Sequence, residues 1–148
     1  MTASLGSLEG KRVYIDANVF IFFLDGTPGL REPASVVLTA AREGAFHAVT
    51  GDAAVAEVMA GPYRLGDPLI IRATRDFFHQ PRFLTIVRHT AETFDAAAML
   101  RGTLDIPFID ALHLATAAEA GCDAVITHDA RMRPALGVDV VPLVDSDR

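Results

Sequence analysis

The sequence contains a single cysteine, Cys122, and so has no internal disulfide. Disulfides persist in oxidising compartments, and a lone cysteine is typical of a protein from the reducing cytoplasm. The longest uninterrupted apolar run, residues 19–24, is six residues long, whereas a membrane-spanning helix needs about 20. The first residues also lack a charged segment followed by an apolar core, which is the pattern of a secretory signal. We therefore expect a cytoplasmic protein with no membrane segment.

Zinc motifs, internal repeats, low-complexity tracts and linkers are also missing. The sequence has no HExxH motif and no cysteine pair, which argues against a zinc site. Hydrophobic residues make up 51% of the chain and charged residues 22%, an ordinary balance for a globular protein. With 148 residues, the chain is large enough to bury its own core. We expect a single domain over residues 1–148.

Positive charge is scarce overall, with a formal net charge of −6, and this argues at first against a nucleic-acid partner. The charge is unevenly distributed, however. Residues 61–90 carry a net +3, and their basic side chains are the arginines at positions 64, 72, 75, 82 and 88. A cluster of carboxylates that holds divalent cations also attracts phosphate. The overall charge therefore does not exclude RNA.

Short apolar runs alternate with amphipathic segments along the whole chain. The pattern predicts strands at residues 12–15, 46–50, 83–87, 124–127 and 138–144. It predicts helices at residues 18–24, 31–43, 52–59, 68–79, 91–104 and 107–121. Residues 61–68, rich in glycine and proline, are expected to form an irregular loop. This alternation is typical of an α/β sandwich with a mostly parallel central sheet and an edge strand at the C-terminal end.

Four carboxylates stand at positions where chemistry is expected. Asp16 and Asp129 each follow an apolar strand, and ligands collect beyond the carboxyl ends of strands in open α/β sheets. Asp110 lies in the first turn of the helix that follows Pro107, where the helix dipole favours an ionised carboxylate. Glu57 lies in a helical pattern that Asp52 is positioned to cap. Each acid alone is equally compatible with a solvated surface residue.

Taken together, the sequence segments that carry these four acids resemble those of the PIN-domain nucleases. The resemblance rests on IDANVF (15–20), AVAEVM (54–59), FIDALHLATA (108–117) and VITHD (125–129). The order and spacing of these motifs are similar to those of the small bacterial toxin ribonucleases of the VapC kind, over nearly the whole chain. The resemblance implies a PIN-domain-like α/β/α sandwich.

The resemblance also implies a function. A toxin ribonuclease of this kind uses one or two Mg²⁺ or Mn²⁺ ions, held here by Asp16, Glu57, Asp110 and Asp129, to hydrolyse RNA to 5′-phosphate and 3′-hydroxyl products. Hard cations of this type prefer carboxylate and water oxygens. The expected partners are an RNA substrate, a VapB-like protein antitoxin and further copies of the chain in a homodimer or higher oligomer.

Several polar residues near these acids have two interpretations. Asn18 either orients Asp16 or a bound water, or caps the following helix. Thr127 either orients the metal ligands or is an ordinary strand residue. Thr50 is a weaker candidate of the same kind. His113, one turn after Asp110, is expected to be a core or orienting histidine, since no zinc motif accompanies it.

Two departures from the expected patterns leave alternatives open. The acidic residue that often follows the last family acid is replaced by Ala130, Arg131 and Met132, which leaves the number of metal ions undecided. A non-catalytic PIN-like module that binds RNA or protein is one alternative. A phosphatase with Asp16 as its nucleophile is another, but such enzymes usually have an aspartate where this chain has Asn18.

Overall fold

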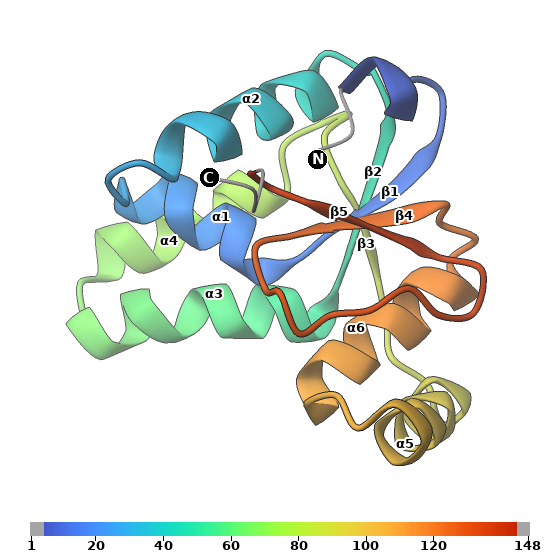
Figure 1. Cartoon of the computed structure of the whole chain (residues 1–148). Helices are drawn as coiled ribbons and strands as arrows, with labels where there is room; N and C mark the ends of the chain where they lie inside the picture. The colour runs from blue at the N-terminus through green and yellow to red at the C-terminus, as the bar shows by residue number, and fades with distance from the viewer. Residues whose placement is uncertain (1–4, 145–148) are drawn as a thin grey trace.

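The computed structural model describes residues 5–144 and contains one five-stranded parallel sheet between two layers of helices (Figure 1). The strands are β1 (Arg12–Ile15), β2 (His47–Gly51), β3 (Thr85–Val87), β4 (Ala124–Thr127) and β5 (Asp139–Pro142). They lie in the order β3-β2-β1-β4-β5. The predicted α/β/α sandwich with a parallel sheet is therefore confirmed, and β5 is the edge strand expected from the sequence.

A short 3-10 helix, η1 (Leu5–Leu8), precedes six α-helices. These are α1 (Ala17–Asp25), α2 (Arg31–Arg42), α3 (Asp52–Leu65), α4 (Pro68–Phe78), α5 (Ala91–Leu104) and α6 (Phe108–Glu119). The helices α1 to α4 pack on one face of the sheet and α5 and α6 on the other (Figure 1). None of the helices within residues 5–144 is long and apolar enough to cross a membrane.

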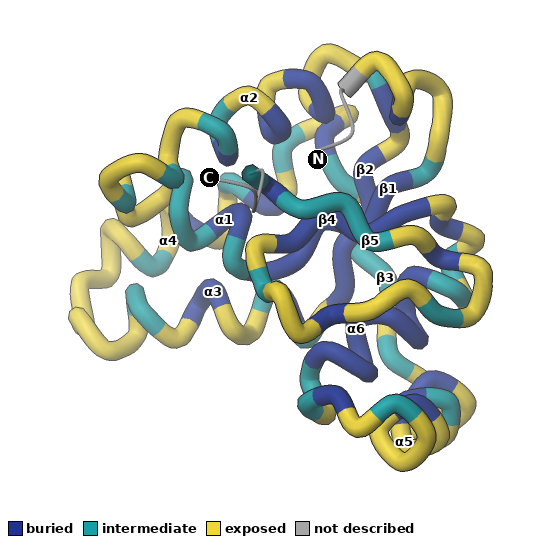
Figure 2. Tube along the Cα trace, in the orientation of Figure 1, coloured by how far each residue is buried: buried dark blue, intermediate teal, exposed yellow. Residues whose placement is uncertain are grey.

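The central strand β1 explains why the core has two halves. Successive side chains of a strand point to opposite faces, so Val13 and Ile15 join the core under α1 and α2, while Tyr14 joins the core under α5 and α6. All three side chains are fully buried. In Figure 2 the three inner strands β1, β2 and β4 appear as a buried centre, whereas the turn between α3 and α4 is exposed. A strand covered on both faces is typical of parallel sheets.

The strand order creates a switch point between β1 and β4. The chain moves from β1 outward through β2 to β3, crosses back over the other face through α5 and α6, and enters β4 on the opposite side of β1. Crevices form at such points, outside the carboxyl ends of the strands. Asp16 follows β1 and Asp129 follows β4, so the topology brings both acids to this crevice.

The largest departure from the sequence prediction is α3. It does not end at Met59 in an irregular loop but continues to Leu65 with Pro62 inside the helix. Proline has no backbone N–H to donate to the preceding turn, yet the helix continues for three residues past Pro62. Gly66, in the left-handed conformation with φ of 72°, ends the helix, and Asp67 caps α4.

Three smaller expectations are also wrong. Asp52 does not cap α3, because it is the first residue of the helix and Gly51 occupies the cap position. Asn18 does not cap α1, because Asp16 does. The amphipathic pattern of residues 31–43 predicts that Val36 and Val37 both face inward, but in α2 only Val37 is buried and Val36 is exposed.

Candidate metal-binding active site

Asp16 is held rigidly at the end of β1. Its Oδ1 accepts a hydrogen bond of 2.7 Å from the backbone N–H of Ala17, and this bond caps α1. Its Oδ2 accepts from the Thr127 hydroxyl at 2.6 Å and from the Asn18 amide at 3.2 Å. The side chain is buried, and burial raises the pKa of Asp16, although the charge of His113 and these hydrogen bonds oppose the shift. The carboxylate thus has one orientation, fixed by two strands and a helix end.

Asn18 and Thr127 connect Asp16 to the chain that follows β4. The Asn18 amide also donates to the Thr127 hydroxyl at 3.1 Å, and its oxygen accepts from the backbone N–H of His128 at 3.2 Å. The Thr127 hydroxyl in turn accepts from the backbone N–H of Asp129 at 3.0 Å. Both residues predicted to orient the acids therefore contact Asp16 directly. Thr50 lies further away and donates to the carbonyl of Ile15 at 2.8 Å.

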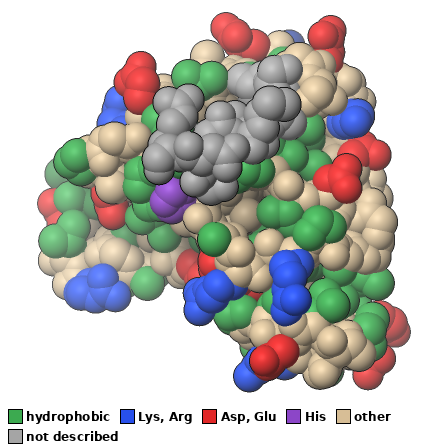
Figure 3. Space-filling model, viewed as in Figure 1, with side chains coloured by type: hydrophobic (Ala, Val, Ile, Leu, Met, Phe, Trp, Pro, Cys, Tyr) green, Lys and Arg blue, Asp and Glu red, His purple; other side chains and the backbone are tan. Residues whose placement is uncertain are grey.

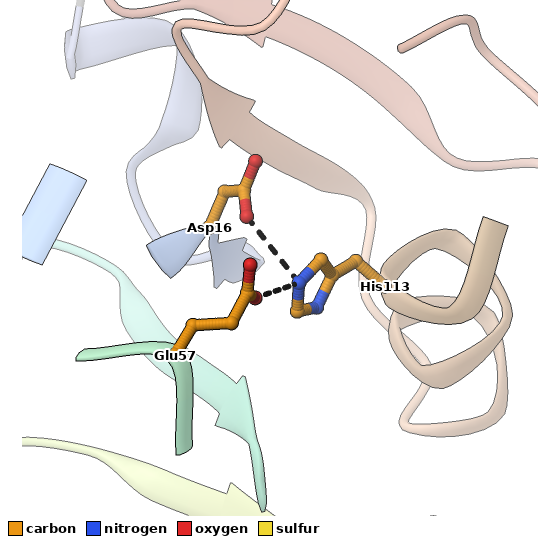
Figure 4. A group of neighbouring side chains, drawn as sticks. All are labelled: Asp16, Glu57 and His113. Atoms are coloured by element: carbon orange, nitrogen blue, oxygen red, sulfur yellow. Dashed lines mark hydrogen bonds and ion pairs between the residues drawn. The ribbon is translucent and has the colours of Figure 1, made fainter. Parts of the chain in front are cut away.

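His113 brings Glu57 to Asp16. Its Nε2 lies 2.8 Å from Oε1 of Glu57 and 3.5 Å from Oδ1 of Asp16 (Figure 4). Potential ligand atoms of these three residues lie within 4.8 Å of one another. Burial lowers the pKa of His113, but the hydrogen bond to Glu57 and the charge of Asp16 outweigh it and the net shift is upward. On the other side of the ring, Nδ1 lies 2.7 Å from the Tyr14 hydroxyl. This buried, orienting position agrees with the expectation for His113.

Asp110 and Asp129 form the second half of the site. Asp110 is buried and its Oδ2 receives no hydrogen bond from any described donor. Burial raises the pKa of Asp110, and the hydrogen bond to Asp129 and the negative charge of Asp129 add to the shift, so that the pKa is about 7. Hydrogen bonds from Arg131 lower the pKa of Asp129. The two carboxyl groups are thus close enough to share a proton when no cation is present.

These residues fit a hard divalent cation. Buried carboxylates that lie close together repel each other when ionised, and either a shared proton or a cation relieves the repulsion. The unpartnered Oδ2 of Asp110 is an oxygen ligand without a hydrogen-bond donor to satisfy it. Asp16 and Glu57 add further oxygen atoms, the ligand type that Mg²⁺ and Mn²⁺ prefer. The structure thus brings Asp16 and Glu57 together through His113, and Asp110 and Asp129 together directly.

A model of the PIN domain family matches residues 13–135 of the sequence. The chain belongs to the PIN domain family. The resemblance seen in the sequence motifs is thereby confirmed. No match to this PIN domain was found among curated protein sequences.

Several solved structures share the fold of this PIN domain. A toxin–antitoxin complex from Klebsiella pneumoniae is 21% identical with a TM-score of 0.66, and the match covers 85% of this chain and 94% of that one. VapC20 of Mycobacterium tuberculosis, described as a sarcin–ricin loop cleaving toxin, is 13% identical with a TM-score of 0.67 over 81% and 92% of the two chains. FitAcB of Neisseria gonorrhoeae is 18% identical with a TM-score of 0.67 over 88% and 97%.

His89 is a residue of this PIN domain that the sequence reasoning missed. Its Nε2 accepts a hydrogen bond of 2.8 Å from the backbone N–H of Ala53 and so caps α3, the helix that carries Glu57. Its Nδ1 lies 2.7 Å from the Thr116 hydroxyl on α6. A Cβ on Gly51 would lie 2.8 Å from both the His89 ring and the Tyr14 hydroxyl, so the capping position is restricted to glycine. The available signal was that His89 follows β3, at the same edge of the sheet as the acids.

Arg131 is the second missed residue. Its Nε and Nη2 donate to the two oxygens of Asp129, each at 3.1 Å, and its backbone N–H donates to Oδ1 of Asp129 at 2.9 Å. The sequence showed only that an arginine stood where an acidic residue was expected. Its short distance along the chain from Asp129 was the only indication of this contact.

Proposed function

We propose that this PIN domain is a Mg²⁺- or Mn²⁺-dependent endoribonuclease, and that it is the toxin component of a toxin–antitoxin pair acting in the cytoplasm. The observation that carries the proposal is the buried, unpartnered Oδ2 of Asp110 within a group of four carboxylates at the switch point of the sheet. The match to the family model and the toxin structures among the fold neighbours support it.

The four acids would act as the metal-binding set. Asp16 and Asp110 offer buried oxygens, and Glu57 and Asp129 offer more exposed ones. Bound there, a divalent ion supplies a water of lowered pKa and charge compensation for the phosphate. Asn18 and Thr127 hold Asp16 in one orientation, which keeps its oxygens directed at the site without conformational search.

His113 would position Glu57 rather than bind substrate. With Nε2 donating to Glu57, the imidazole fixes a side chain that is otherwise 38% exposed on α3. Burial lowers the pKa of His113, but the hydrogen bond to Glu57 and the charge of Asp16 raise it overall. His113 therefore sets where the Glu57 carboxylate stands and balances part of the negative charge beside Asp16.

RNA is the substrate that we assign. The arginines 64, 72, 75, 82 and 88 are all exposed. On the face seen in Figure 3, acidic and basic side chains are interspersed rather than gathered in a broad band of one sign. Phosphate recognition is then a local matter of the metal site and a few arginines, and affinity should depend moderately on salt. Cleavage of the sarcin–ricin loop by the neighbour VapC20 supports an RNA substrate.

An apolar groove beside the acids is the site that we assign to the antitoxin. It has a volume of about 770 Å³ and is lined by residues of α1, α3 and α4, including Ile21, Leu24, Glu57, Val58 and Ile70. From the sequence alone, the groove for an antitoxin segment would be expected near Phe22 and Phe23, in the apolar run that follows Asp16. Neither residue lines the groove, because Phe22 packs on His128 and Phe23 on Phe77. Because Glu57 belongs to both the groove and the metal site, a bound segment would also block the acids.

A contact between copies of the chain is assigned to the outer surface of α5 and α6. Phe94 and Phe108 stack there with ring centroids 6.5 Å apart and planes within 8°. Both rings are nearly half exposed, at 46% and 45%. Exposed aromatic pairs of this kind are typical of surfaces that another protein covers.

One experiment separates this function from the alternatives. Purified protein is incubated with Mn²⁺ and either single-stranded RNA or a phosphate monoester, with an Asp16→Asn variant as the control. The proposal predicts cleavage of RNA only, and none by the variant. Hydrolysis of the monoester would indicate a phosphatase, and binding of RNA without cleavage would indicate a non-catalytic module.

A further inference from the structure

We infer that the guanidinium of Arg131 takes the place of a second divalent cation in this site, so that the PIN domain binds one metal ion. The inference rests on the proposed function, because it concerns the same four carboxylates. The Asp129 oxygens, which would otherwise be ligands for an ion, are occupied by a cationic side chain of the same chain.

The contact between Arg131 and Asp129 has the geometry of a fixed pair. Two parallel N–H groups meet the two carboxylate oxygens at 3.1 Å each, and a backbone N–H adds a third bond of 2.9 Å to Oδ1. A planar guanidinium matches a carboxylate in this fork arrangement, which a lysine ammonium cannot reproduce. Three donors on one carboxylate leave little room for a metal ion on the outer side of Asp129.

The loop that carries Arg131 is anchored at several points. Met132 is buried at 4% exposure, and the guanidinium of Arg133 donates to the carbonyl of Leu104 at the end of α5. Further along the loop, Ala135 and Val138 form a backbone bridge. Arg131 therefore emerges from a fixed backbone beside Asp129 rather than from a free loop.

The charges of the site agree with a single ion. Asp16, Glu57, Asp110 and Asp129 carry a formal −4 when ionised. One divalent ion and the guanidinium of Arg131 together supply +3, which compensates most of this negative charge. A second divalent ion at Asp129 would have to displace Arg131 from the two carboxylate oxygens. The missing acid after Asp129, where Ala130, Arg131 and Met132 stand, removes a ligand that such an ion would use.

Counting bound Mn²⁺ tests the inference without reference to activity. Isothermal titration calorimetry, with electron paramagnetic resonance of free Mn²⁺ as a second count, is applied to the wild-type protein and to Arg131→Ala, Arg131→Gln and Arg131→Lys. We expect one ion in the wild type and a rise toward two in the alanine and glutamine variants, because Asp129 becomes free. Arg131→Lys retains the charge and should stay at one. Arg88→Ala is the matched control and should also bind one ion. It makes an equal charge change at an exposed residue directly after β3, the edge strand opposite β5.

The outcomes are distinguishable. Two ions in the wild type, or one ion in both the wild type and the alanine and glutamine variants, would overturn the assignment of Arg131 while leaving the metal site in place. No binding by any variant would instead remove the metal site and with it the proposed function. Thermal unfolding of each variant establishes that it is folded, which the exposure of Arg131, at 69% of its side chain, favours.

Discussion

His113 donates from Nε2 to Oε1 of Glu57 at 2.8 Å, so a side chain buried in α6 fixes the position of an exposed side chain on α3. The two helices lie on opposite faces of the sheet. This hydrogen bond therefore connects the two faces at the edge of the sheet where the acids lie. The carboxylate of Glu57, although exposed, is thereby held in one position. The geometry of the acidic side chains in the site therefore depends on this hydrogen bond as well as on the acids themselves.

Replacing His113 by asparagine should reduce RNA cleavage about 10- to 100-fold, the usual effect of removing a partner that orients a metal ligand. Without the imidazole, Glu57 loses its donor and Asp16 loses a nearby positive charge. Cleavage rates and Mn²⁺ affinity by calorimetry measure the effect. Tyr14→Phe, which removes a hydroxyl on the far side of the ring, is the control and should cost less. Equal activity of His113→Asn and wild type would show that Glu57 needs no support.

Replacing Asp110 by asparagine should abolish cleavage and leave the metal-free protein at least as stable as the wild type. The pKa of Asp110 is raised to about 7 in the folded state, so the unfolded chain, with its ordinary pKa near 3.9, binds fewer protons between these values. Stability of the wild type in EDTA therefore falls as the pH rises from about 4 through 7, by about 1–3 kcal/mol. The variant should lack this fall.

The measurement for Asp110 is calorimetric unfolding in EDTA at several pH values, with Asp95→Asn on the exposed face of α5 as the control. Clear destabilisation of Asp110→Asn at pH 8 would make Asp110 a structural residue instead. A wild-type curve that is flat between pH 4 and 7 would contradict the raised pKa.

Activity should require a hard divalent ion, with Mn²⁺ at least as effective as Mg²⁺ and Ca²⁺ poor. Ligation by carboxylate and water oxygens suits the octahedral geometry of the smaller ions, whereas Ca²⁺ prefers more ligands at longer distances. Cleavage assays in each metal after treatment with EDTA provide the measurement. Full cleavage in excess EDTA would rule out a metal-dependent mechanism.

Replacing Leu24 by aspartate should weaken binding of the proposed antitoxin by at least tenfold. Leu24 lines the apolar groove, and a carboxylate there would have to be desolvated by any apolar segment that binds. Titration calorimetry with the purified partner measures the affinity. Val36→Asp introduces the same charge at an exposed position of α2 outside the groove and should leave binding unchanged. Equal affinities for the two variants would place the partner elsewhere.

Replacing His89 by alanine should destabilise the protein by about 1 kcal/mol, the usual cost of losing a helix cap. The backbone N–H of Ala53 then loses its acceptor at the start of α3. Chemical unfolding measures the change, and His47→Ala, at an exposed ring that bonds only Thr85, should have a smaller effect. If the two substitutions cost the same, the cap contributes nothing specific.

The sequence predicted those parts of the fold that depend on local patterns. Apolar runs located β1 and β4 to the residue, and the helix predicted at residues 91–104 matches α5, which begins with a capping box formed by Thr90 and Thr93. The extension of α3 through Pro62 was not predictable in this way. The last turn of α3 is stabilised by packing against α4, where Arg75 contacts the Tyr63 hydroxyl. These stabilising residues lie outside the α3 segment.

In the candidate site, too, local sequence patterns were predictable and contacts between distant segments were not. Asp16 and Asp129 were predictable because each lies within two residues of the end of a strand, and the carboxyl ends of parallel strands meet at one edge of the sheet. The contacts of His113 and His89 were not, since both depend on how α5 and α6 cross the sheet. The pairing of Arg131 with Asp129 depends on the loop backbone, for which the residues gave no pattern.

The hydrogen bond between Thr127 and Asp16 spans 111 positions of the sequence, and this has a consequence during translation. A growing chain that has not yet reached β4 lacks both the hydroxyl that orients Asp16 and the acid at position 129. It therefore has no assembled site, however well its first half has collapsed. The four acids can therefore come together only after β4 has been synthesised, later than the residues of α1, α3 and α4 that line the apolar groove.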